Sequence, residues 1–322
     1  MPDFLSLLMG RPPRRTVETV IPERTFADVI LPPATRRTLD DALAQVRNHT
    51  LIFNRWGLGE RHASGLGLAF NFAGPPGTGK TICAEAIAHE LGMKLLVVNY
   101  AEVESMWVGE TPKNVVAAFR AAAEQNAVLF FDEADAIAAR RSAGDTMPAM
   151  REANITVNVL LRELEDFNGV VIFATNLAAN FDPAFERRIR THVRFEMPGV
   201  EERERIWRVQ FHPSKTPLAR DVDFGVLAER YPVSGGDIKN AVIKAAVIAA
   251  AEPGADAVKR IHQRHLERGM DEVMAGKDVM QQTLFDAKPV DDPWRRVALL
   301  ALGLAGAALV AALLALGIAL LR

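Results

Sequence analysis

The chain has 322 residues, of which 49% are hydrophobic and 24% are charged, and its formal net charge is −2. This is the composition of an ordinary globular protein with ample apolar residues for a core, sufficient for one domain plus a smaller one or plus appendages. The near-zero charge gives no electrostatic case for binding nucleic acid. The single cysteine, Cys83, excludes an intrachain disulfide, indicates a reducing compartment and is predicted to lie in the core.

Residues 1–24 are predicted to be an N-terminal extension and linker. The first residues are apolar but include Asp3 instead of an early positive charge, so they do not resemble a signal peptide. Arg11–Arg15 is rich in proline and is expected to be extended. Phe26–Val46 begins the globular part with a helical stripe of apolar residues, and a connector that contains several glycines follows it to Gly67.

The next part of the chain alternates predicted strands with predicted helices. The strands are Leu66–Ala73, Lys94–Asn99, Ala127–Phe131, Val170–Ala174 and His192–Glu196. The third and fourth are continuous apolar runs, which predicts burial on both faces, whereas the fifth alternates and is placed nearer an edge. Helices follow the first two strands, one ending at Gly92 and the other spanning Pro112–Gln125. We therefore expect a five-stranded parallel α/β sheet with flanking helices over residues 25–197.

Between the first strand and its helix lies a stretch with the spacing G-x-x-x-x-G-K-[ST]. Its glycines allow consecutive backbone N–H groups to form an anion-binding nest, at which the following helix directs the positive end of its dipole. Lys80 supplies a cation for the outer phosphates of a nucleotide, and Thr81 supplies a hydroxyl for Mg²⁺. A chance match in a glycine-rich turn is the alternative, but strand and helix lie where the motif needs them. The predicted cofactor-binding residues are Gly74, Pro75, Pro76, Gly77, Thr78, Gly79, Lys80 and Thr81.

Acidic and amide side chains follow two of the buried strands. Asp132 can hold the Mg²⁺ that bridges the phosphates, while Glu133 can orient and partly deprotonate the attacking water. After the fourth strand, the neutral amide of Asn176 can bridge that water and the terminal phosphate. The alternatives are a solvated acidic turn or a D-E-A-D helicase, which needs a second RecA-like domain for which this chain has no room.

A basic cluster follows Asp182-Pro183. Arg187, Arg188 and Arg190 belong to it, and such clusters are usually solvated. A second hypothesis is an arginine that is supplied to the phosphates of a neighbouring subunit, where it stabilises charge in the transition state. That hypothesis requires a ring built by head-to-tail contacts. Arg187 and Arg188 are the predicted catalytic arginines, and their order relative to Arg190 stays open.

After Pro198 the pattern predicts helices and no strands, so residues 198–276 are expected to form a small all-α subdomain. Polar residues without periodicity follow and are predicted to be a linker over residues 277–296. The predicted helices are Glu201–Phe211, Phe224–Tyr231, Gly236–Ala251 and Asp256–Met274.

The segment Val297–Leu321 is predicted to be a transmembrane helix. It has 25 residues without a charged or polar side chain, and about 20 suffice to cross the hydrocarbon core. Trp294, Arg295 and Arg296 precede it, and the basic residues favour a cytoplasmic location for the N-terminal side. A buried core helix is the alternative. We therefore expect a single-pass C-terminal membrane anchor with the rest of the chain in the cytoplasm.

Over about residues 25–275, the chain resembles the AAA+ ATPases, and most closely their AAA clade. Gly74–Thr81 resembles the Walker A motif and Val128–Glu133 the Walker B motif of that family. Asn176 resembles sensor 1, and Asp182–Arg188 resembles the second region of homology with its arginine fingers. The resemblance implies a large α/β ATPase domain, a helical lid, ATP with Mg²⁺, and a homo-hexamer with nucleotide between the subunits.

Two further elements resemble the nucleotide-binding parts of that family. Asp28-Val29 is similar to the adenine-side element, although Ile30 stands where the family has glycine. Ser234–Asp237 resembles the lid element that approaches the nucleotide. The resemblance therefore implies that the cofactor is also bound by Asp28, Val29, Gly235, Gly236 and the nearby cation Lys239.

The segment Ser105–Glu110 is similar to the first pore loop of protein-remodelling members such as katanin and spastin. The resemblance implies that Trp107 and Val108 grip a polypeptide in a central pore, although Met106 stands where lysine is common. Packing of Trp107 under its own loop is the alternative.

The sequence thus predicts a membrane-anchored ATPase that unfolds, extracts or disassembles protein substrates through a hexameric pore. The alternative from another class is a nucleotide-dependent switch or scaffold that docks a partner complex at the membrane without threading. Nucleic acid is not expected as a partner.

Overall fold

The computed structural model describes residues 18–61, 67–99, 110–135, 148–176 and 182–281. The chain divides into two compact units, Met1–Met270 and Asp271–Arg322. The predicted pore loop with Trp107 and Val108 and the predicted membrane-spanning segment 297–321 lie outside the described residues. Within the described ranges, no helix has both the length and the apolarity that crossing a bilayer requires.

The first unit contains a sheet of six strands in the order β1-β3-β4-β5-β2-β6. All neighbouring strands are parallel except β1, which runs antiparallel to β3. The strands are β1 (Glu18–Val20), β2 (Leu68–Ala73), β3 (Lys94–Asn99), β4 (Ala127–Asp132), β5 (Val170–Thr175) and β6 (Thr191–Arg194).

The α/β class and the five parallel strands match the prediction, but the sheet has one strand more. β1 lies within residues 1–24, which the sequence predicts to be an extension and linker. Its three residues are mostly exposed and too short to show a strand periodicity. These residues form a strand because they pair with the free edge of β3, more than seventy positions later in the chain. A partner at that separation leaves no signal in the local sequence.

Helices precede, separate and follow the strands. Those up to β6 are α1 (Pro33–Arg47), the π-helix η2 (Thr50–Arg55), α2 (Leu58–Arg61), α3 (Lys80–Glu90), α5 (Glu110–Gln125), α6 (Pro148–Asp166) and the 3₁₀ turn η4 (Pro183–Phe185). Those after β6 are α7 (Val200–Val209), α8 (Phe224–Arg230), α9 (Gly235–Ala251), the 3₁₀ turn η5 (Asp256–Val258) and α10 (Gln263–Gln281).

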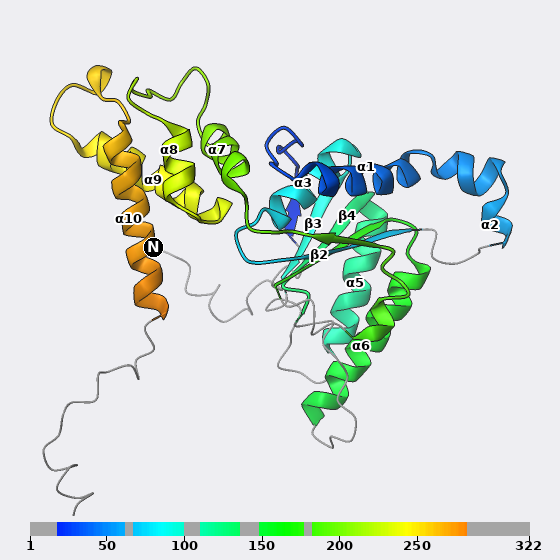
Figure 1. Ribbon diagram of the computed structural model, residues 1–322. Helices are drawn as coiled ribbons and strands as arrows, with labels where there is room; N and C mark the ends of the chain where they lie inside the picture. Colours follow the sequence, from blue (N-terminus) through cyan, green and yellow to red (C-terminus); the bar gives the residue numbers. More distant parts are fainter. Residues whose placement is uncertain (1–17, 62–66, 100–109, 136–147, 177–181, 282–322) are drawn as a thin grey trace, which may run out of the picture. The chain divides into compact units, whose positions relative to one another are not determined.

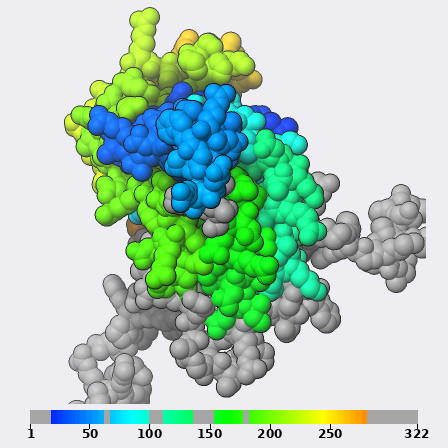
Figure 2. All heavy atoms as spheres, turned by 90° about the vertical axis from the view of Figure 1, so that its right-hand side faces the viewer, coloured from blue at the N-terminus to red at the C-terminus, as the bar shows by residue number. Residues whose placement is uncertain are grey.

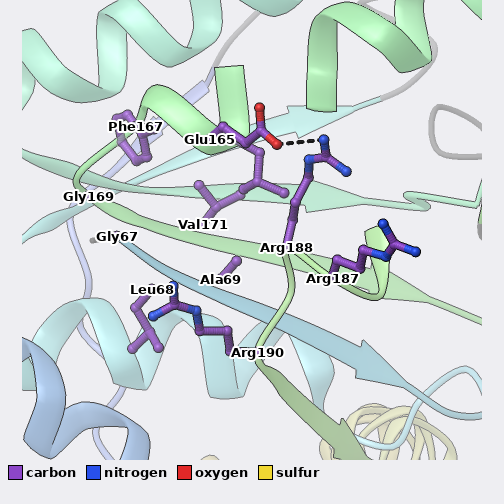
Figure 3. Close-up of a pocket in the computed structure, with 11 residues that line it drawn as sticks. Gly67, Leu68, Ala69, Glu165, Phe167, Gly169, Val171, Arg187, Arg188 and Arg190 are labelled. Carbon is purple, nitrogen blue, oxygen red and sulfur yellow. Dashed lines mark ion pairs between the residues drawn. The ribbon is translucent and has the colours of Figure 1, made fainter. Parts of the chain in front are cut away.

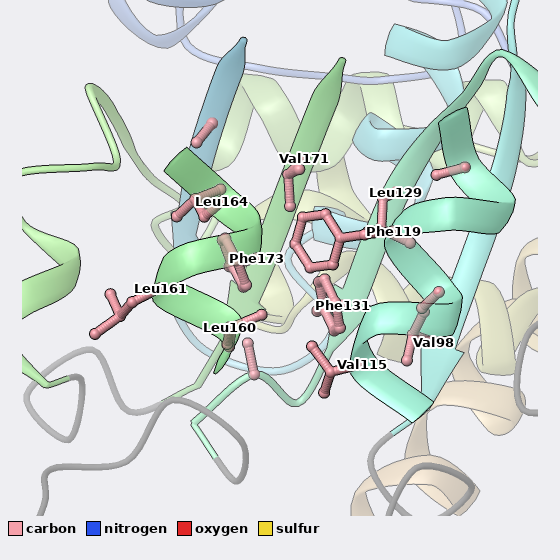
Figure 4. Close-up of a cluster of buried hydrophobic side chains, with 14 of the residues drawn as sticks. Val98, Val115, Phe119, Leu129, Phe131, Leu160, Leu161, Leu164, Val171 and Phe173 are labelled. Carbon is pink, nitrogen blue, oxygen red and sulfur yellow. The ribbon is translucent and has the colours of Figure 1, made fainter. Parts of the chain in front are cut away.

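Two layers of helices enclose the sheet (Figure 1). α1 and α3 cover one face, where their apolar residues pack against Phe70, Phe72 and Phe130. α5 and α6 cover the other face, where the rings of Phe131 and Phe173 stack with centroids 5.2 Å apart (Figure 4). β4 and β5 are buried almost throughout, as their continuous apolar runs predict, and alternating β6 lies at the edge.

The part of the chain after β6 is helical in the described residues. α9 begins with a capping box in which Ser234 and Asp237 bond each other's backbone N–H groups. α10 starts at Gln263 and not at Asp256 as predicted. The reason is a tertiary contact: Ile261 exchanges backbone hydrogen bonds with the segment Pro217–Ala219, which keeps residues 259–262 extended.

Candidate functional site

The register of the sheet gathers the predicted phosphate-binding, metal-binding and water-activating residues at one edge. Ala73 lies opposite Thr175, and Asn99 lies opposite Asp132, so β2, β3, β4 and β5 end at similar heights. The loops that follow these strands therefore share the carboxyl edge, where ligands bind in open α/β sheets.

The phosphate loop, residues 74–79, has the backbone of an anion-binding turn. Gly77 and Gly79 have φ angles of +76° and +98°, which favour glycine. Gly74 lies against Phe195, the residue that follows β6, since a Cβ atom on Gly74 would be 2.0 Å from the carbonyl oxygen of Phe195. Gly79 is the N-cap of α3, so the first free N–H groups of this helix face the loop. The loop therefore fits a phosphate group.

Lys80 connects the phosphate loop to the end of β5. Its ammonium group donates hydrogen bonds to the carbonyl oxygens of Gly74 at 2.7 Å and Pro75 at 2.9 Å, and to Oδ1 of Asn176 at 2.9 Å. Burial lowers the pKa of Lys80, and the charges of Asp132 and Asp135 oppose this shift. The structure thus brings together the predicted phosphate-binding cation and the predicted sensor amide.

The acidic residues after β4 have different environments. Oδ1 of Asp132 accepts the backbone N–H of Glu133 at 3.0 Å. Glu133 is exposed and has a φ angle of +52°, a conformation that costs free energy for a residue other than glycine and is concentrated at functional sites. Asp135, for which the sequence predicts no role, accepts a hydrogen bond from Oγ1 of Thr175 at 2.9 Å and thereby ties this loop to β5.

Two oxygen-bearing side chains at this edge are suitable ligands for Mg²⁺. Thr81 presents its exposed hydroxyl from the first turn of α3, and Asp132 presents a carboxylate from the end of β4. In the described ranges, no three His, Cys, Asp or Glu side chains are arranged to hold a metal ion. A site with few protein ligands fits Mg²⁺, which keeps several waters and binds substrate phosphates.

The beginning of α9 reaches the phosphate loop. The backbone N–H of Gly236 donates to the carbonyl oxygen of Gly77 at 2.9 Å. A Cβ atom on Gly77 would lie 2.6 Å from Oγ of Ser234, so the two segments touch. Lys239 is exposed one turn further along α9. The structure therefore places Gly235 and Gly236 beside the loop, as the resemblance implies.

The segment Asp28-Val29, which resembles the adenine-side element, makes hydrogen bonds within its own turn. Oδ2 of Asp28 accepts the backbone N–H of Thr25 at 2.8 Å and its hydroxyl at 3.0 Å. The backbone hydrogen bond from Thr25 lowers the pKa of Asp28. Val29 is buried among residues of α1 and α3. The Asp28 carboxylate is thus engaged in a turn through its Oδ2 atom.

The three arginines lie at the opposite, amino edge of the sheet (Figure 3). With Gly67 and Gly169, which precede β2 and β5, they line a cavity of about 140 Å³. A second cavity of about 220 Å³ at this edge is lined by residues of α1 together with Gly67 and Gly169. Figure 2 turns this side toward the viewer and shows the blue residues that precede β2 against the green residues of the later part of the domain. The arginines are therefore remote from the phosphate loop of their own chain.

Arg188 and Arg187 differ in their contacts. Arg188 pairs with Oε1 of Glu165 at 2.5 Å and donates to the carbonyl oxygen of Ala184 at 2.9 Å. Arg187 is exposed, points away from Glu165 (Figure 3) and has no hydrogen bond or ion pair to any residue that the structure describes. The sequence contains no signal for the pairing of Arg188 with Glu165, because it depends on where α6 ends.

Comparison with known proteins agrees with this geometry. Residues 70–198 match the AAA family, the ATPase family associated with various cellular activities. The chain is 37% identical over 263 residues to the ATP-dependent zinc metalloprotease FtsH 3 of Sphaerobacter thermophilus, covering 79% of this chain and 50% of that protein. It is 33% identical over 294 residues to the ATP-dependent zinc metalloprotease FtsH of Methylococcus capsulatus, covering 88% and 44%. The FtsH of Thermus thermophilus is 32% identical over 271 residues, covering 82% and 41%.

Residues 70–198 therefore correspond to an AAA ATPase domain, and the reaction of such a domain is hydrolysis of ATP with Mg²⁺. The matched residues begin in β2 and end after β6, so they contain the phosphate loop, the acidic residues after β4 and the arginines. The chain spans half or less of the length of these three relatives.

Proposed function

We propose that this chain is one subunit of a membrane-anchored ring that couples hydrolysis of ATP to the unfolding, extraction or disassembly of protein substrates. The observation that carries the proposal is the carboxyl edge of the sheet, where Lys80 bonds Asn176 and exposed Glu133 has a left-handed backbone. The relatives, whose names describe ATP-dependent proteases, support an action on proteins.

At the carboxyl edge, each residue has a separate task. The loop from Gly74 to Gly79 and the ammonium group of Lys80 hold the phosphates, while Thr81 and Asp132 hold Mg²⁺. Bound Mg²⁺ neutralises charge on the phosphates. Glu133 orients the attacking water and accepts its proton.

The arginines support assembly of a ring. A side chain at the amino edge cannot serve the phosphate loop of its own chain, which lies at the carboxyl edge. Head-to-tail packing of subunits brings the amino edge of one against the carboxyl edge of the next, and a closing rotation produces a ring. We assign the trans-acting role to exposed Arg187, because Arg188 is held by Glu165 and Ala184. A hexamer is the ring size that the family resemblance supports.

Threading of a polypeptide through the pore is assigned to Trp107 and Val108, on the likeness of their loop to that of katanin and spastin. Trp107→Ala should keep ATPase activity within about twofold, while the rate of unfolding of an added protein falls at least tenfold, because the aromatic grip is lost. The unfolding rate is measured from the ATP-dependent protease sensitivity of a tethered fluorescent substrate. Trp107→Phe, which keeps an aromatic ring, is the matched control.

The alternative function, a switch or scaffold without threading, predicts a different result in this assay. The tethered substrate then stays protease-resistant with ATP in the wild-type chain, although it still associates with the ATPase. Equal unfolding by the wild type and Trp107→Ala would contradict the pore assignment and leave the ATPase assignment intact.

Membrane attachment is assigned to residues 297–321, with the ATPase domain on the cytoplasmic side. We expect the full chain to stay in the membrane fraction after extraction at alkaline pH, and Leu309→Arg to be released in much larger part. A charge at the centre of a span costs about 2.5–3.5 kcal/mol in insertion. Leu309→Ala keeps the segment apolar and should remain attached. Full extraction of the wild-type chain would contradict the anchor.

A further inference from the structure

The segment between β1 and α1, residues 21–32, forms a strap that contains Asp28-Val29, the element that resembles the adenine-side element. The strap crosses α3, the helix that begins at Lys80 (Figure 1, dark blue beside α3). Oε1 of Glu85, in the middle of α3, accepts the backbone N–H of Glu23 at 2.9 Å and of Arg24 at 3.1 Å. One carboxylate oxygen thus holds two consecutive amides of the strap.

The other hydrogen bonds and ring contacts of the strap run to α1 or stay within the strap. The guanidinium group of Arg36 in α1 lies 3.8 Å from the ring centroid of Phe26. Thr25 and Asp28 bond each other in a tight turn. Among the residues that the structure describes, Glu85 is the one polar side chain of α3 that bonds the strap.

These bonds connect the phosphate-binding part of the site, at the start of α3, to the strap that contains Asp28-Val29. α3 carries Lys80 and Thr81 at its first turn and Glu85 little more than one turn later. A helix is stiff over so short a distance, so the carboxylate sets where residues 23–24 lie relative to the phosphate loop. The turn Thr25–Asp28 directly follows residues 23–24 in the chain, and Val29 is buried against α1 and α3. Hydrogen bonds to a charged acceptor are stronger than neutral ones.

We propose that Glu85 is a positioning residue that fixes the distance between the adenine-binding strap and the phosphate loop. This inference rests on the proposed function, together with the family resemblance that assigns Asp28-Val29 to the adenine of ATP. Glu85 itself touches no part of the nucleotide. Its loss leaves the phosphate-binding half intact and loosens the adenine-binding half, so it affects binding of the base and not the chemical step.

The test compares Glu85→Ala with Glu85→Gln in the full chain. We expect Glu85→Ala to raise the KM for ATP about tenfold, equivalent to about 1.4 kcal/mol, with kcat within twofold. Inhibition by tripolyphosphate, which has no base, should stay unchanged. Glu85→Gln, whose amide oxygen still accepts hydrogen bonds, should recover most of the ATP affinity. Hydrogen exchange at the amides of residues 23–24 should speed up in Glu85→Ala, while exchange within α3 does not change.

Glu90→Ala is the matched control, because Glu90 lies on the same helix but pairs with Arg47 of α1 at 2.5 Å. An equal rise in KM in Glu90→Ala would overturn the proposal in favour of a general loosening of α3. An unchanged KM or unchanged exchange at residues 23–24 in Glu85→Ala would also overturn it. If the wild-type chain hydrolyses nucleoside triphosphates with different bases equally well, the assignment of Asp28-Val29 to the adenine is refuted. The hydrogen-exchange data would still show whether Glu85 holds the strap.

Discussion

Glu133→Gln is expected to bind ATP as the wild-type chain does and to hydrolyse it at least about a hundredfold more slowly. Glu133 directly follows β4, its side chain is exposed, and its backbone has a left-handed conformation. The main chain therefore sets the direction of the Glu133 side chain. Glutamine has nearly the same shape and adopts the same position. Its neutral amide cannot accept a proton from water, so binding is retained and the chemical step is lost.

The measurement combines phosphate release at saturating ATP with a direct titration of Mg-ATP. Asp135→Asn is the matched control, because Asp135 belongs to the same acidic stretch but bonds Thr175. It should retain far more activity than Glu133→Gln. Wild-type turnover in Glu133→Gln would refute the role of Glu133 as the base.

Arg187→Ala is expected to lower kcat by about a thousandfold, the lower end of the range for arginine fingers. The variant should fold normally, since Arg187 is exposed and bonds no residue in the described ranges. Arg188→Ala should instead lower the melting temperature, because it removes the ion pair with Glu165 and the bond to Ala184. The side chain of Arg190 is also exposed at the same edge. The loss of kcat in Arg190→Ala, compared with the loss in Arg187→Ala, shows which of the two arginines contributes more.

Mixing two inactive variants tests whether Arg187 acts across a subunit boundary. Lys80→Ala removes the phosphate-binding cation of a site, and Arg187→Ala removes the arginine that the chain offers to its neighbour. In a mixed ring, an Arg187→Ala subunit with an intact phosphate loop can sit beside a Lys80→Ala subunit with an intact Arg187. ATPase activity should therefore reappear on mixing and rise with protein concentration. No recovery on mixing, or full activity in Arg187→Ala alone, would contradict a trans-acting role.

Some helices that the sequence analysis did not predict nevertheless have an apolar periodicity that indicates a helix. α6 is one of them, since Val157, Leu160, Leu161 and Leu164 recur with helical spacing and all belong to the buried cluster. Figure 4 labels the three leucines. The start of α10 has no such signal in the local sequence. The predicted helix is interrupted after the 3₁₀ turn η5, because Ile261 bonds the segment near Leu218 and keeps residues 259–262 extended, and a periodic pattern cannot show such a distant partner.

The sequence by itself determined the phosphate loop, the buried central strands and the acidic residues after β4. Each depends on neighbouring residues: glycine spacing sets the loop backbone, and continuous apolar runs set burial. Only the tertiary structure decided that β1 completes the sheet, that Glu165 holds Arg188 and that Glu85 holds the strap. Those contacts join residues distant along the chain, and their free energy depends on packing that brings charges and backbone groups within bonding distance. No local sequence pattern shows which distant groups come within bonding distance, so these contacts became visible only in the tertiary structure.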